Sequence, residues 1–264
     1  GLKDNRFPDP HIKIFKNPDT GRENMYVYVG HDEGFNQFIM RDWYVMWSED
    51  LVHWNCARSL RREDTYLPAD SVNCWACDCV QSPWDGKYYL YYSNAGDDTG
   101  VAVSDRPDGP FVDARGKTPI LPKGITPTNS YDPDIILPDE DDPNAYILFG
   151  SDWTDHYWAM QLKENMIEID GEITKLEFDQ RWPFTEAAWV HKANGKYYLT
   201  YATGWPEKMA YAMSDSINGP WEFKGLVSEC ASNCNTTHPA IVEHKGRTYM
   251  FTHNGTLPEG TSYS

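Results

Sequence analysis

The segment KYYLYYS, Lys87 to Ser93, is the stretch that decides the fold. It has the length of a β-strand, and tyrosine favours that conformation. Four other segments have the same character: MYVYVG from Met25, AYILFGS from Ala145, KYYLTYA from Lys196 and RTYMFTH from Arg247. Steps of 62, 58, 51 and 51 residues separate their second positions, which are Tyr26, Tyr88, Tyr146, Tyr197 and Thr248. Such a period is typical of β-propeller blades.

Two further elements keep step with these segments. A Ser, followed in two of three copies by a Gly-Pro turn and an aromatic residue, recurs at Ser48, Ser104 and Ser214. A four-residue motif precedes every Tyr-rich segment: Asp9-Pro10-His11-Ile12, Ala76-Cys77-Asp78-Cys79, Asp132-Pro133-Asp134-Ile135, Ala187-Ala188-Trp189-Val190 and His238-Pro239-Ala240-Ile241. Five copies without an interrupting linker predict one all-β domain over residues 1–264, a five-bladed β-propeller. Because the chain stops at Ser264, the fifth blade is expected to be truncated at the C-terminus.

The first positions of this motif carry the candidate site. The first strand of each propeller blade lines the central axis, so equivalent residues of these strands converge. Those residues are Asp9, Ala76, Asp132, Ala187 (directly after Glu186) and His238. Taken singly, an Asp before Pro is equally a common turn residue. Together, three carboxyl groups in register around one axis raise one another's pKa values, which indicates a catalytic site rather than a structural one.

Composition limits the partners. The formal net charge of −17 argues against nucleic acid, whose phosphates require a basic surface. No apolar run approaches the roughly 18 residues that span a membrane, so no membrane partner is expected. The start Gly1-Leu2-Lys3 is not a signal peptide, and the chain is interpreted as a processed mature form or an excised fragment. A secreted or periplasmic location is expected, with a cytoplasmic location left open.

Six cysteines occur at positions 56, 74, 77, 79, 230 and 234. They suit buried small hydrophobic residues, or one or two disulfides in a secreted protein. A zinc site from Cys74, Cys77, Cys230 and Cys234 is a weaker alternative, because nothing else in the sequence supports tetrahedral ligation.

These motifs resemble glycoside hydrolase family 43, the five-bladed propeller enzymes that act on arabinose- and xylose-containing glycans. The segment Asp9-Pro10 is similar to the family's first-blade motif, YDPDIIL (131–137) to its third-blade motif, and TEAAWV (185–190) to its fourth-blade motif. The resemblance covers essentially the whole chain. Ala187-Ala188 replaces the family's Gly-Pro, and Cys77 replaces a Pro; neither removes a carboxyl group.

The resemblance implies an inverting glycosidase acting on arabinofuranosyl or xylosyl linkages of plant cell-wall polysaccharides or their oligosaccharides. Asp9 is then the general base, Glu186 the general acid, and Asp132 the residue that orients Glu186 and raises its pKa. Trp75, Trp189 and Trp205 are the candidate sugar platforms, with His238 as a further substrate contact. No cofactor is required for the chemistry.

For some family members the resemblance also implies a structural calcium ion on the propeller axis, contacted through water by the fifth-blade histidine, here His238. Imidazole is not a preferred ligand of hard cations, so a hydrogen-bonded His238 without metal is the alternative.

Two other functions remain open. One is another sugar-active five-bladed propeller, a fructan hydrolase or a mannoside phosphorylase; the latter requires a basic phosphate pocket, and no Arg/Lys cluster lies near Asp9 or Glu186 in the sequence. The other is a carbohydrate-binding propeller without catalysis, which would bind sugar but turn nothing over.

Overall fold

The computed structural model describes residues 6–34, 37–150, 156–177, 184–230 and 234–255. They form four four-stranded antiparallel sheets and one two-stranded sheet, and the only helix among them is a 3-10 turn, Arg62–Asp64. None of these residues belongs to a helix long and apolar enough to cross a membrane. The strands are, sheet by sheet, β1 (His11–Lys16), β2 (Glu23–Asp32), β3 (Met40–Ser48) and β4 (Asn55–Arg61); β5 (Cys74–Gln81), β6 (Tyr88–Asn94), β7 (Asp98–Ser104) and β8 (Val112–Asp113); β9 (Asp134–Ile136), β10 (Ala145–Phe149), β11 (His156–Leu162) and β12 (Ile169–Glu177); β13 (Glu186–Ala193), β14 (Lys196–Thr203), β15 (Lys208–Ser214) and β16 (Glu222–Ser228); β17 (Ala240–His244) and β18 (Arg247–Phe251).

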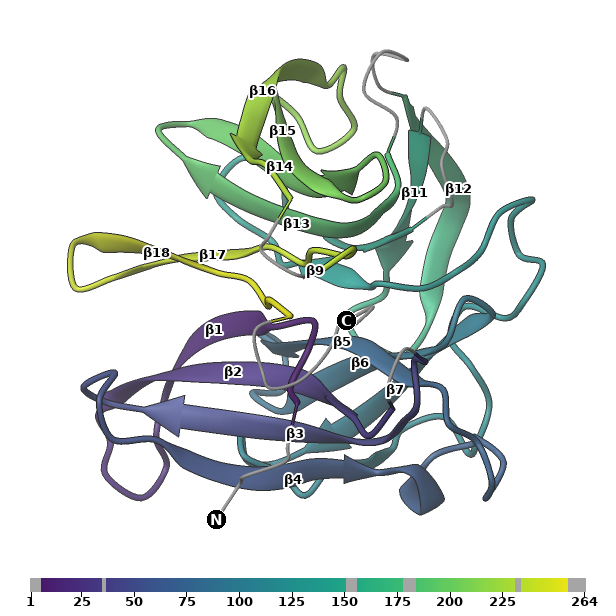
Figure 1. The fold of residues 1–264 in the computed structure, drawn as a ribbon, viewed down its shortest axis with the longest axis vertical. Helices are drawn as coiled ribbons and strands as arrows, with labels where there is room; N and C mark the ends of the chain where they lie inside the picture. Colours follow the sequence, from purple (N-terminus) through teal and green to yellow (C-terminus); the bar gives the residue numbers. More distant parts are fainter. Residues whose placement is uncertain (1–5, 35–36, 151–155, 178–183, 231–233, 256–264) are drawn as a thin grey trace.

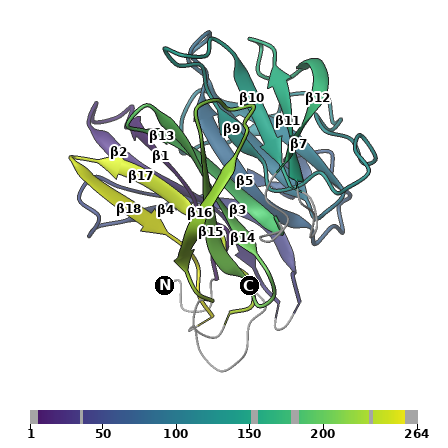
Figure 2. The ribbon, with the colours of Figure 1, turned by 90° about the horizontal axis from the view of Figure 1, so that it is seen from above.

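The four four-stranded sheets are blades of a β-propeller. Each begins with an inner strand, and β1 contacts β5, β5 contacts β9, β9 contacts β13, β13 contacts β17, and β17 contacts β1. Figure 1 shows the hairpin of β17 and β18, in yellow, between the blade of β1–β4 and the blade of β13–β16, and Figure 2 shows the blades from above. The prediction of an all-β propeller is confirmed, and the motifs found in the sequence lie at the inner strands.

The Ser of the second repeated element ends the third strand of a blade. Ser48 Oγ accepts the backbone N–H of Leu51 at 2.8 Å, and Ser104 Oγ and Ser214 Oγ make the equivalent bonds two residues ahead, at 3.1 Å each. These bonds satisfy backbone donors where the strand turns. The aromatic residues after the Gly-Pro turns, Phe111 and Trp221, are buried.

Tyrosines explain the aromatic composition, because several of them reach from one blade to another part of the chain. Tyr28 on β2 donates its hydroxyl to the carbonyl of Pro107 at 2.6 Å, and Tyr91 on β6 donates to the carbonyl of Met166 at 2.7 Å. Both rings are fully buried. A buried phenol needs a hydrogen-bond partner, so these contacts both fill the spaces between blades and fix their positions.

Candidate active site

Three first-position residues of the repeated motif share one unusual backbone conformation. Asp9, Asp132 and Ala187 have φ values of 55°, 52° and 59°, in the left-handed region. Aspartate tolerates this region better than most residues. In all three residues the backbone N–H donates a hydrogen bond to a side chain from another segment. The acceptors are His253 Nδ1 for Asp9 (3.2 Å), Ser93 Oγ for Asp132 (3.0 Å) and Asp132 Oδ2 for Ala187 (2.9 Å). Pro8 and Pro10 therefore flank a residue with a turn conformation just before the first inner strand.

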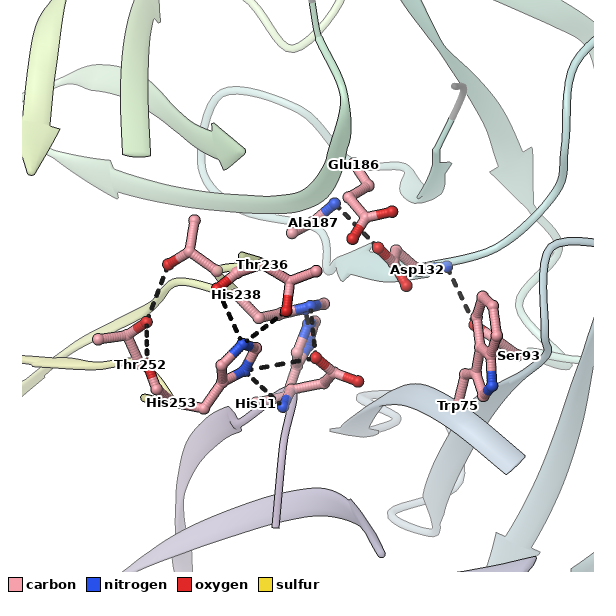
Figure 3. Close-up of polar contacts among 12 residues, drawn as sticks. His11, Trp75, Ser93, Asp132, Glu186, Ala187, Thr236, His238, Thr252 and His253 are labelled. Carbon is pink, nitrogen blue, oxygen red and sulfur yellow. Dashed lines mark hydrogen bonds and ion pairs between the residues drawn. The ribbon is translucent and has the colours of Figure 1, made fainter. Parts of the chain in front are cut away.

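The three predicted carboxyl groups line one cavity. Asp9, Asp132 and Glu186 all line it, from three different blades, and its volume is about 370 Å³. Figure 3 shows Asp132 and Glu186 with their carboxyl groups toward one another and Trp75 on the other side of Asp132. In three blades the residue directly before the four-residue motif also lines this cavity. These residues are Trp75, Tyr131 and Glu186. The register shifts between Cys74 and Cys77 on β5 and between Glu186 and Trp189 on β13 fall at this level.

Glu186 begins β13 and is half-buried. Tyr131, the residue before Asp132, donates its hydroxyl to Glu186 Oε2 at 3.0 Å. Asp132 is 4% exposed, and its Oδ2 accepts the N–H of Ala187, the residue after Glu186. Asp132 and Tyr131 thus hold the backbone and the side chain of Glu186 in place, which is the arrangement that a positioned proton donor requires.

Asp9 lies between two imidazole rings. Its Oδ1 is 3.6 Å from His238 Nδ1 and 3.5 Å from His253 Nδ1, and its side chain is 19% exposed. Burial, and then the charges of Glu186 and Asp32, raise the pKa of Asp9 to about 8. Burial lowers the pKa of His253 to about 4, and burial together with His11 and His253 lowers the pKa of His238. Because both rings are neutral at pH 7, neither supplies a positive charge that would stabilise ionised Asp9.

Glu207 is a fourth carboxyl group in the cavity, which the sequence reasoning missed. It is 1% exposed, and its Oε2 accepts the N–H of Thr237 at 2.7 Å. Burial, followed by the charge of Glu186, raises the pKa of Glu207 to about 10, so this carboxyl group is protonated at pH 7. It lies in the turn between β14 and β15, outside the repeated motif; the signal in the sequence was a glutamate directly after Trp205-Pro206.

Two of the three predicted aromatic platforms line the cavity. Trp75 contacts Phe38 edge-on, with ring centroids 5.4 Å apart, and Trp205 is 52% exposed at the rim. Trp189 does not line it. That ring is 3% exposed and packs against the ring of His11 and the ammonium group of Lys13, at 5.1 Å and 4.7 Å. The prediction that Trp189 stacks on a sugar is therefore corrected: the residue is part of the core below the cavity.

His238 also lies below the cavity rather than along it. It is 2% exposed; its Nε2 is 2.8 Å from His11 Nε2, and its Nδ1 faces Asp9. One of the two facing Nε2 atoms must carry the proton, so they form a hydrogen bond. With one nitrogen bonded to His11 and the other beside Asp9, the described residues do not fit an ion that His238 would contact through water. His238 therefore lies behind Asp9, not among the residues that line the cavity.

The cysteines do not form a metal site in the described part of the chain. All six are free thiols, and Cys74, Cys77, Cys79 and Cys234 are buried. The two groups of side chains with metal-like spacing contain no cysteine. The interpretation of these cysteines as small hydrophobic residues is confirmed for the four buried ones.

Several carboxyl groups and a tryptophan around one cavity on a β-propeller axis define the site of a sugar-hydrolysing enzyme, since glycoside hydrolysis uses a pair of carboxyl groups. The sequence profile of the glycosyl hydrolases family 43 matches residues 5–263, and the chain belongs to this family of glycosidases.

Individual relatives agree with this assignment. The chain is 29% identical to a xylosidase/arabinosidase from Bacteroides ovatus, over 97% of this chain and 88% of that protein. It is 31% identical to a β-xylosidase from Xylanibacter ruminicola, over 93% and 86%. Among solved structures, an α-L-arabinofuranosidase from Clostridium thermocellum ATCC 27405 superposes with a TM-score of 0.77 at 28% identity, covering 94% of this chain and 82% of that one.

Proposed function

We propose that this glycosidase cleaves xylosyl or arabinofuranosyl linkages in plant cell-wall polysaccharides or their oligosaccharides, with inversion at the anomeric carbon. The observation that carries the proposal is the convergence of Asp9, Asp132 and Glu186 on one cavity that Trp75 also lines. The relatives named above as xylosidases and arabinosidases support the substrate class. A further structural relative, at 25% identity and a TM-score of 0.81, is a β-xylosidase/α-arabinofuranosidase from a compost microbial metagenome in complex with xylotriose.

In the proposed mechanism Asp9 deprotonates the attacking water and Glu186 protonates the departing sugar oxygen. A base works best when its pKa lies near the working pH, and the pKa of about 8 gives Asp9 high basicity once it is ionised. Asp132 positions Glu186 through the Ala187 N–H. Glu207, as a neutral acid, can donate a hydrogen bond to a sugar hydroxyl without adding charge beside Glu186. Trp75 and Trp205 offer faces to the apolar side of a sugar ring.

Two competing functions have weaker support. A phosphorylase needs basic groups around the phosphate, and the described residues that line the cavity include neither Arg nor Lys. A carbohydrate-binding propeller without catalysis has no use for four carboxyl groups in one cavity, which cost free energy through mutual repulsion.

The proposal is tested with nitrophenyl α-L-arabinofuranoside and nitrophenyl β-D-xyloside. We expect turnover of at least one, and proton NMR of the first product should show the anomer of inverted configuration. Binding of xylo-oligosaccharides without any turnover would favour the non-catalytic propeller. A retained anomer would exclude Asp9 as the base that activates water.

We also propose that the sheet of β17 and β18 is the inner half of a fifth blade. Its inner strand contacts both β13 and β1, the place a fifth blade would take. The proposal predicts that a variant without residues 240–251 has a lower Tm in thermal unfolding, because β1 and β13 then lose the strand that both of them contact.

Secretion or export to the periplasm belongs to the same proposal, because cell-wall polysaccharides lie outside the cell. Fractionation of the native host with an antibody to the protein would test it, and activity confined to the cytoplasm would contradict it.

A further inference from the structure

Below the catalytic cavity, the third positions of the repeated motif form a second set of side chains around the axis. We call this set the third-position ring; its members are His11, Asp78, Asp134, Trp189 and Ala240. All five are at most 3% exposed. Asp78 Oδ2 accepts the N–H of Ile135 at 2.8 Å, and Asp134 Oδ2 accepts the N–H of Val190 at 2.6 Å. Each carboxylate thus joins its own blade to the following one.

Three members of the ring have the spacing of a metal site. One ligand atom each from His11, Asp78 and Asp134 lies within 4.8 Å of the others. Asp134 Oδ1 is buried and makes no hydrogen bond within the described residues. On geometry alone this group could bind a divalent cation.

A lysine from the same strand as His11 already supplies a positive charge there. Lys13 Nζ is 3.1 Å from Asp78 Oδ1, which in turn is 3.2 Å from His11 Nδ1. The ammonium group also lies over the ring of Trp189, and its side chain is 19% exposed. A carboxylate at this distance favours the charged form of the ammonium group. Lys13 is therefore charged.

A cationic group is already in place beside these three side chains. Lys13 Nζ lies 3.1 Å from Asp78 Oδ1, at the distance of a direct ion pair. One ammonium group then faces one carboxylate. A divalent ion added beside Lys13 would place like charges within a few ångströms in a dry interior, at a high electrostatic cost.

We propose that the ammonium group of Lys13 supplies the positive charge that a metal ion on the propeller axis would otherwise supply. The stability of the fold is then independent of divalent cations. The ammonium group holds Asp78, and through it His11, which hydrogen-bonds His238 beside Asp9. The residues that would surround an axial ion are present in this chain, but a lysine from β1 fills the role of the ion.

Thermal unfolding in 5 mM EDTA and in 5 mM CaCl₂ tests the proposal with three proteins. The wild type should have the same Tm in both buffers. Lys13→Met should lose about 10 °C in EDTA, because a buried carboxylate loses its partner. CaCl₂ should restore part of this loss, since the three ligand atoms are then free of the ammonium group. Lys16→Met, an exposed position on the same strand, is the matched control and should behave as the wild type.

Three results would overturn the proposal: a wild-type Tm that falls in EDTA, a Lys13→Met protein as stable as the wild type in EDTA, or a destabilised Lys13→Met protein that gains nothing from CaCl₂. Should Lys13→Met fail to fold, Lys13→Met combined with Asp78→Asn removes both charges and keeps an acceptor for the Ile135 N–H. That double variant is expected to fold, and its failure to do so would also count against the proposal.

Discussion

Two rings of side chains surround the same axis, two motif positions apart along the inner strands, and they use carboxyl groups in opposite ways. The first-position ring consists of Asp9, Ala76, Asp132, Ala187 and His238. Its two carboxyl groups, Asp9 and Asp132, line the cavity together with Glu186 and Glu207. Its carboxyl groups have no lysine or arginine among the described lining residues, and the pKa values of Asp9 and Glu207 are raised. In the third-position ring Lys13 neutralises Asp78, and the carboxylates bond the backbone of the next blade.

This difference indicates that a cationic partner distinguishes a carboxyl group that stabilises the fold from one that is suited to catalysis. An unpaired carboxyl group in a partly buried cavity stores electrostatic free energy, which a bound substrate or a transferred proton can release. A paired carboxylate stabilises the fold and has no such capacity. Substitutions in the first ring should therefore affect mainly activity, and substitutions in the third ring mainly stability.

The largest expected effect is that of Asp9→Asn. Without a base to activate water, kcat should fall by up to about 10⁴-fold on every substrate, including those with good leaving groups. Steady-state kinetics with nitrophenyl glycosides would measure this, and the thermal unfolding curve should show that the protein is folded. Substantial activity would assign the base to another residue.

Glu186→Gln should distinguish substrates by their leaving group. Hydrolysis of xylobiose or an arabino-oligosaccharide should slow by about 10³-fold, because the departing sugar oxygen needs a proton. A 2,4-dinitrophenyl glycoside, whose leaving group is stable as an anion, should lose far less. Equal losses on both substrates would contradict the role of Glu186 as the acid.

The register of the repeated motif was enough to predict an all-β propeller and the convergence of three candidate carboxyl groups on one cavity. Because equivalent positions of inner strands must converge, Asp9, Asp132 and Glu186 could be brought together from segments far apart in sequence. Glu207 and His253 could not, since they come from the turn between β14 and β15 and from the residues after β18, outside the motif. Trp189 was misassigned because it stands at the third motif position, whose side chains, such as those of His11, Asp78 and Asp134, are buried below the cavity.

For the third-position ring, Asp78→Asn should cost stability. It leaves the ammonium group of Lys13 without its carboxylate, and breaking a buried ion pair on one side costs about 3 kcal/mol or more. Urea unfolding followed by tryptophan fluorescence would measure the loss. Asp105→Asn, at a side chain that is 87% exposed, is the control and should leave the midpoint unchanged. If the urea midpoint of Asp78→Asn equalled that of the wild type, the claim that the third-position ring stabilises the fold would be wrong.

Glu207→Gln should raise stability, and more so at alkaline pH. The folded pKa of about 10 lies above the ordinary value of 4.5, so the unfolded chain loses this proton first, and stability declines as pH rises from 4.5 toward 10. Gln removes that decline and still accepts the Thr237 N–H. We expect a Tm gain of about 2–4 °C at pH 8 and a smaller one at pH 5. A lower Tm at pH 8 would mean that the ionised form of Glu207 stabilises the fold.

The smallest expected effect tests whether a buried carboxyl group outside the first-position ring acts on Asp9 through space. Asp32, which is 2% exposed, is one of the groups whose negative charge raises the pKa of Asp9. Asp32→Asn removes that charge but keeps an oxygen for the Gly34 N–H that Asp32 Oδ1 accepts at 2.7 Å. Ionisation of Asp9 then becomes easier, so the acid-side limb of the kcat/KM profile should move to lower pH, by less than about one unit. Asp97→Asn, which breaks only a surface pair with Lys123, should leave the limb in place. Since the acid limb reports the base of the free enzyme, a limb that stays fixed or moves upward would show that Asp9 does not titrate under the influence of Asp32.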